Sequence, residues 1–210
     1  MAKRSAPEVN AGSMADIAFL LLIFFLVTTD IATDSGLNRK LPPMIEETNP
    51  PKIKERNIFQ LNVNRANQIF LKADGEERLV ELKDLRAAAV KFLDNGGGIG
   101  KDACDGCQGA KNPKSSDNFD KAIISLSNDR LTKYKTYIAV QNEIIAAYNT
   151  LRDREFIKRY PAMGMSFVEA NERYLDPQTP ASEQEDLKDK LEAIKILIPQ
   201  KFSEAETKSN

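Results

Sequence analysis

A single carboxylate, Asp16, stands at the start of the most apolar run of the chain, within the stretch SMADIAFLLLIFFLV. Every residue from Ile17 to Val27 is apolar, and residues 10–29 provide about the 20 positions that a helix needs to cross the hydrocarbon layer of a membrane. A charged aspartate at the centre of an isolated membrane helix costs about 2.5–3.5 kcal/mol, and less near the helix end. The chemistry open to such an acid is the binding and release of a proton.

The helix itself offers no partner for this acid. At about 100° per residue, Leu20, Ile23 and Val27 lie on the same side as Asp16, so that face is apolar through the hydrocarbon. No basic residue lies on the same helix. The carboxyl group therefore faces a polar pocket of another protein or a water path, or it stays protonated. The simpler alternative is an interfacial aspartate that reaches back to water.

Two other interpretations of the apolar run are weaker. Lys3 and Arg4 give the basic start of a secretory signal peptide, but Asp30 falls where a small residue is needed before Ala32, so no clear cleavage site follows. A buried helix of a soluble protein is disfavoured because large apolar residues occupy all faces of the run instead of one stripe. The positive-inside rule places the short N-terminus in the cytoplasm and the rest of the chain outside, in the periplasm of a bacterium.

Composition excludes several classes of function. The 210 residues carry 30 basic and 31 acidic side chains, a net charge of −1, so no overall field attracts nucleic acid. The chain has no histidine, the side chain that most often serves as metal ligand or general base. Two cysteines cannot supply a four-ligand zinc site. We therefore expect no enzyme, no cofactor and no metal.

The apolar run resembles the N-terminal signature of the ExbD/TolR family of biopolymer transport proteins. The resemblance is carried by Met14–Thr29, read as MADIAFLLLIFFLVTT, followed by Leu41-Pro42-Pro43. It implies that Asp16 is a proton-binding residue of a motor driven by the proton-motive force. Thr28 and Thr29 also match the signature, which implies polar contacts within the membrane.

The resemblance also implies partners. An inner-membrane protein of this family pairs with a second copy, and its helices sit inside a pentamer of an ExbB/TolQ-type protein with three spans, surrounded by membrane lipid. The output drives a TonB- or TolA-type energy transducer, which energises outer-membrane transport or envelope maintenance. The alternative from another class is a membrane-anchored periplasmic binding module without an energetic role.

After a proline-rich stretch, the sequence predicts a small α+β domain. Alternation predicts strands at residues 58–64 and 68–72, the latter ended by Asp74-Gly75, with a strand fragment at 78–80 and a further strand at 121–126. Helical spacing predicts helices over residues 82–93 and 133–160. Ser166-x-x-Glu169 and Ser182-x-x-Glu185 predict capping boxes that open two short helices, and residues 193–198 predict the closing strand. This order favours helices packed on one side of a sheet.

Cys104 and Cys107 lie in a polar insertion within this domain. In an oxidising periplasm we expect them to form a small disulfide loop, with free thiols, redox chemistry or shared metal binding as alternatives.

The complete organisation predicted is a cytoplasmic N-terminus (1–12), a transmembrane helix (13–33), a proline-rich linker (34–56), a periplasmic α+β domain (57–203) with insertions at about 95–118 and 162–192, and a C-terminal tail (204–210).

Overall fold

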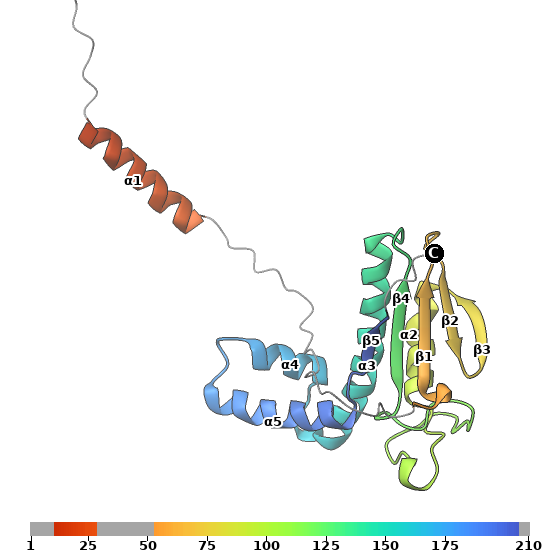
Figure 1. Cartoon of the computed structure of the whole chain (residues 1–210). Helices are drawn as coiled ribbons and strands as arrows, with labels where there is room; N and C mark the ends of the chain where they lie inside the picture. Colours follow the sequence, from red (N-terminus) through yellow and green to blue (C-terminus); the bar gives the residue numbers. More distant parts are fainter. Residues whose placement is uncertain (1–10, 29–52, 206–210) are drawn as a thin grey trace, which may run out of the picture. The chain divides into compact units, whose positions relative to one another are not determined.

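The computed structural model describes residues 11–28 and 53–205, which fall into two compact units, Met1–Pro50 and Pro51–Asn210. The first unit contains the helix α1 (Ala11–Thr28), drawn in red in Figure 1. Within the described ranges, we find no helix that combines the length and the apolar character required to cross a membrane. The predicted span of residues 13–33 coincides with α1 as far as Thr28, and its remaining residues lie outside the described part of the chain.

Local sequence accounts for α1. Straight-chain and large apolar side chains follow Gly12 without proline or a further glycine, so nothing interrupts the ladder of backbone hydrogen bonds. Every side chain described in α1 is exposed in the isolated chain, including Phe19 and Phe24. Within its own unit, α1 therefore presents an apolar surface on all sides.

The second unit is built around a five-stranded mixed sheet in the order β3-β2-β1-β4-β5 (Figure 1). The central strand β1 pairs antiparallel with β2 and parallel with β4, while β3 and β5 form the edges. The hairpin between β2 and β3 turns at Asp74-Gly75, where both residues have positive φ, the geometry of a two-residue type I′ turn. The strands are β1 (Ile58–Val63), β2 (Ile69–Ala73), β3 (Glu76–Val80), β4 (Ile123–Asn128) and β5 (Phe202–Glu204).

Among the residues that the structure describes, one face of this sheet is covered and the other is open. Along β1, Phe59, Leu61 and Val63 are buried, whereas Gln60 and Asn62 between them are exposed. The buried face packs on α2 (Leu82–Leu93) and α3 (Tyr134–Arg159), which also contact each other. The structure therefore confirms the α+β class, and the period-two alternation of apolar residues explains the covered face.

The insertion after α2 is a compact loop. It contains one short 3₁₀ helix (Gly100–Asp102) and is tied to the end of α2 by backbone hydrogen bonds, including Gly97 N–H to Ser116 O at 2.9 Å. A Cβ atom on Gly98 would lie only 1.9 Å from the carbonyl oxygen of Asp102. The run of glycines therefore permits a close backbone approach that no other residue would allow.

A helical hairpin follows α3, formed by α4 (Phe167–Leu175) and α5 (Ala181–Leu197). It has a small core of its own, in which Phe156 from α3 packs on Phe167 with ring centroids 6.2 Å apart. The predicted capping box at Ser166 is present: Glu169 N–H donates to Ser166 Oγ, and Ser166 N–H donates to the Glu169 carboxylate. The backbone hydrogen bond from Ser166 to the Glu169 carboxylate, with a smaller contribution from the Ser166 side chain, lowers the pKa of Glu169.

Two expectations for this region are wrong. The second capping box does not form, because α5 begins directly after Pro180 and Ser182 therefore lies inside its first turn. Residues 193–198 are not the closing strand but continue α5 up to its C-cap. Their β-branched composition favours a strand, yet Leu187, Leu191, Ile194 and Ile198 are all buried and repeat at helical spacing, so packing against α3 decides the conformation.

We predict that Leu187→Ala loosens the hairpin while leaving the sheet intact. The side chain is fully buried in the small core, so its truncation should cost about 2–5 kcal/mol locally. Hydrogen exchange should then accelerate in α4 and α5 but not in β1 or β4. Leu175→Ala is the matched control, because Leu175 lies in the same hairpin but is 62% exposed. Equal hydrogen-exchange rates in α4 and α5 of the two variants would contradict the conclusion that the hairpin has a core of its own.

Candidate functional site

Asp16 is the sixth residue of α1 and its one charged residue. Its side chain is exposed, and it forms no hydrogen bond or ion pair with any residue in the described ranges. Large apolar side chains surround it along the helix, among them Ile17 and Leu20, each 59% exposed. The arrangement is a lone carboxyl group near one end of an apolar helix.

The structure does not bring Thr28 near this acid. Thr28 lies twelve residues further along α1, which places it about 18 Å along the axis and about 120° around it. Its hydroxyl group donates to the carbonyl oxygen of Phe24 at 2.7 Å, one turn back in the same helix. Thr29 lies outside the described residues. Contacts of Thr28 and Thr29 with a membrane partner remain predictions.

The second unit contains a buried polar cluster that sequence analysis missed. We call Lys54, Arg56, Asn57, Asp102 and Asp117 the entry clamp, because it holds the first described residues of this unit. The Asp117 side chain is fully buried, with Oδ1 2.5 Å from Arg56 Nη2 and Oδ2 3.1 Å from Lys54 Nζ. Asn57 donates to Asp117 Oδ2 at 3.0 Å and accepts from the Asp117 backbone N–H at 2.8 Å.

The entry clamp fixes the end of the predicted linker to the glycine-rich loop. Lys54 Nζ donates to both Asp102 and Asp117, and these bonds raise the pKa of Lys54. The same contact with Lys54 lowers the pKa of Asp102. Since the buried carboxylate of Asp117 meets two cations and one amide, its charge is compensated where it sits. The entry clamp therefore holds the residues before β1 against the loop, through ion pairs and hydrogen bonds among its own members.

A second charged group joins α3 to the other end of the same loop. Arg154 donates from both terminal nitrogens to the Asp94 carboxylate, at 2.6 and 2.9 Å, which raises the pKa of Arg154. Its Nη2 also donates to the carbonyl oxygen of Gly106 at 3.1 Å. Glu155 lies beside it with one carboxylate oxygen 3.5 Å from Arg154 Nε and without a hydrogen bond to it.

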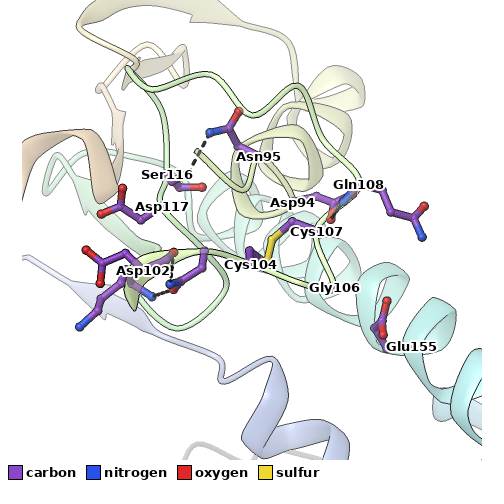
Figure 2. Close-up of a disulfide and its surroundings, with 12 residues drawn as sticks. Asp94, Asn95, Asp102, Cys104, Gly106, Cys107, Gln108, Ser116, Asp117 and Glu155 are labelled. Atoms are coloured by element: carbon purple, nitrogen blue, oxygen red, sulfur yellow. Dashed lines mark hydrogen bonds between the residues drawn. A yellow bond between two sulfur atoms is a disulfide. The ribbon is translucent and has the colours of Figure 1, made fainter. Parts of the chain in front are cut away.

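Cys104 and Cys107 are joined by a disulfide inside this loop, with Cα atoms 5.4 Å apart. Figure 2 shows the bridge between Asp94 at the end of α2 and the short turn that carries Gly106. In residues 11–28 and 53–205, no group of three or more His, Cys, Asp or Glu side chains could hold a metal ion. The loop is held by covalent and ionic contacts: the disulfide, the entry clamp and the Asp94–Arg154 pair.

Sequence alone gave no signal for these pairings. Lys54 and Arg56 fall in the stretch interpreted as linker, and Asn57 is the first residue of the predicted domain, whereas their partner Asp117 lies some sixty residues away. Charged residues in polar segments are usually solvated, so their burial becomes visible only when the segments are packed together. Asp16, by contrast, is conspicuous in sequence because every neighbour on its C-terminal side is apolar.

The chain belongs to the ExbD/TolR family: the family described as biopolymer transport protein ExbD/TolR matches residues 2–150. This confirms the resemblance noted in the sequence, and it supports a membrane-associated transport role in general. The match ends at residue 150, so it leaves out the second part of α3, the α4–α5 hairpin and β5.

One relative gives the same indication. The chain is similar to a protein of Vibrio cholerae serotype O1 named biopolymer transport protein exbD2, with 28% identity over 91 residues. That similarity covers 43% of this chain and 62% of the length of the relative. No solved structure matches the chain.

We predict that Asp117→Asn lowers the free energy of unfolding of the second unit by about 1–3 kcal/mol, because the buried carboxylate shared by the partly exposed Arg56 and Lys54 is replaced by an amide that cannot satisfy both cations. Urea denaturation followed by circular dichroism measures the loss. Asp105→Asn is the control, since Asp105 is exposed in the same loop and should change the free energy by less than about 0.5 kcal/mol. Similar losses in both variants would show that the entry clamp does not stabilise the fold.

A pH dependence should follow from Asp102. Its pKa is lower in the folded protein than the ordinary value of 3.8, so its contact with Lys54 stabilises the fold above that pH and is lost as the pH falls through the depressed pKa. Asp102→Asn should therefore destabilise the protein at neutral pH, and its effect should disappear as the pH falls below the depressed pKa of Asp102. The exposed Asp189→Asn serves as control, and a difference between wild type and Asp102→Asn that does not vary with pH would refute this assignment.

Proposed function

We propose that this protein is an inner-membrane subunit of an ExbB/ExbD-type motor driven by the proton-motive force, in which Asp16 binds and releases protons. The observation that carries the proposal is α1, an apolar helix with a single acid and no covering element among the described residues. Family membership supports the general role in biopolymer transport. The N-terminus lies in the cytoplasm in this proposal, and the α+β body lies in the periplasm.

The apolar surface of α1 is the first argument. Its side chains remain between 44% and 77% exposed for every large hydrophobic residue described from Met14 to Val27. A continuous apolar surface of this kind is not left in water and indicates contact with a membrane or with a partner. In the proposal, lipid and the helices of an ExbB/TolQ-type pentamer cover the span predicted over residues 13–33.

The energetics of Asp16 are the second argument. A charged aspartate in a membrane helix costs up to about 2.5–3.5 kcal/mol, and protonation removes the charge that causes this cost. A proton that moves down the membrane potential supplies about 2.3 kcal/mol per 100 mV. The two energies are similar in size. The gradient is therefore sufficient to change the protonation state of Asp16 and, with it, the pocket of the partner that the side chain prefers.

Repeated switching of this kind moves one set of helices against the other. A pair of α1 helices, one from each of two copies, cannot match all equivalent sites of a five-fold partner at once, so each protonation step favours a new position. Motion of the helices then pulls on the segment that leads to the periplasmic body. The entry clamp receives this pull, because Lys54, Arg56 and Asn57 fasten the incoming chain to the buried Asp117. A TonB- or TolA-type transducer takes up the output.

We predict that Asp16→Asn abolishes transport that depends on the proton gradient, because the amide cannot exchange a proton, while expression and assembly with the three-span partner remain normal. Uptake through an outer-membrane receptor, measured in cells that carry this protein with its partner, tests the loss. Asp16→Glu is the matched variant: it retains a carboxyl group, so it should preserve part of the activity.

The rival function gives the opposite result. If the protein is only a membrane-anchored binding module, Asp16 is an interfacial residue, and Asp16→Asn leaves transport intact. A mature N-terminus near residue 30, found by mass spectrometry, would instead identify residues 1–30 as a cleaved signal and exclude the motor. Co-purification of the partner with Asp16→Asn distinguishes lost proton exchange from failed assembly.

A further inference from the structure

The disulfide in the glycine-rich loop has two unlike ends. Cys107 is 8% exposed and belongs to the main hydrophobic core, where its Cβ atom lies so near Gly96 that a Cβ there would be 2.7 Å away. Cys104 is only partly buried, and Asp105 next to it is exposed. A reagent in solution therefore reaches the bridge from the side of Cys104.

The fold of the loop does not depend on the bridge. Gln108 N–H donates to Asp94 Oδ1 at 3.0 Å and Gly109 N–H donates to Asp94 O at 2.9 Å, immediately after Cys107. Arg154 holds the carbonyl oxygen of Gly106 between the two cysteines. The bridge spans a sequence separation of three, and closing so short a loop removes little conformational entropy from the unfolded chain. Its stabilising role is therefore small.

The same contacts would keep the two cysteines near each other if the bridge opened. When the sulfur–sulfur bond opens, the hydrogen bonds to Asp94 and Arg154 still hold the residues on either side of Cys107, so the two thiols stay close enough to pair again. Cysteines separated by two residues are the spacing that thiol–disulfide exchange uses. Two cysteines that stay close together, with Cys104 more accessible than Cys107, are suited to exchange with a dithiol in an oxidising compartment.

We propose that the Cys104–Cys107 bridge is a thiol–disulfide exchange site for a dithiol partner, with Cys104 as the attacked sulfur. A thiolate of the partner attacks Cys104 Sγ, the bond to Cys107 breaks, and Cys107 leaves as a thiolate that takes up a proton. The second thiolate of the partner then attacks the partner sulfur that is bonded to Cys104. Cys104 leaves as a thiolate and takes up a proton. The partner dithiol is oxidised to a disulfide, and this protein is reduced to two thiols.

Equilibration of the purified full-length protein with mixtures of reduced and oxidised dithiothreitol tests reversibility. Free thiols are trapped by alkylation and counted by mass spectrometry, while circular dichroism reports folding. The reduced fraction should follow the ratio of the two forms in both directions, with the fold retained. The Cys104→Ala/Cys107→Ala double variant should also fold, with little change in melting temperature. A bridge that opens only when the protein unfolds would overturn the proposal and identify a structural staple.

A matched pair of variants tests the direction of attack. In Cys107→Ser the remaining Cys104 should form a mixed disulfide with oxidised glutathione, whereas in Cys104→Ser the buried Cys107 should react at least about tenfold more slowly. Intact-mass measurements over time give both rates. Equal rates in two folded variants would overturn the assignment of Cys104 as the attacked sulfur.

Discussion

The uncovered apolar surface of α1 is the constraint on which the rest of this protein depends. A helix that is apolar on all sides and carries one carboxyl group obtains neither cover nor a counter-charge from the described chain. In the proposed motor, both come from lipid and from other subunits. The single acid then makes the complex sensitive to protons, because the charged and neutral forms of Asp16 have different solvation costs in surroundings of low polarity.

In the proposed motor, the body of the protein meets a different constraint, which is mechanical. Its sheet is covered on one side only, and the chain enters it beside β1, at the centre of the sheet. A pull on a single strand would reach only that strand and its neighbours. The entry clamp spreads the load, because the residues just before β1 are paired with Asp117 in a loop whose other end is held by Asp94 and Arg154. The force is then shared between β1, α2 and α3.

The helix α3 connects two cores. Its first part packs on the sheet through Ile144 and Tyr148, and its last turns carry Phe156 into the core of the α4–α5 hairpin. Arg152 lies at the junction, where its guanidinium donates to the carbonyl oxygen of Ile198 at the end of α5. Burial lowers the pKa of this arginine, and the C-terminal end of a helix is a favourable place for a cation. The part of the chain beyond the family match is thus fastened to the shared fold by one long helix and by the pairing of β5 with β4.

The sequence by itself determined the elements whose signal is local. The apolar run around Asp16, the alternation in β1 and β2, the Asp74-Gly75 turn and the capping box at Ser166 each depend on residues within a few positions of one another, so their types and spacing were sufficient. Tertiary structure alone decided the features that depend on distant partners. Residues 193–198 are helical because α3 offers a groove for Leu191 and Ile194, and Asp117 is buried because cations from the start of the unit meet it there. Such contacts join segments separated by dozens of residues, and their energies arise only when folding excludes water from between them.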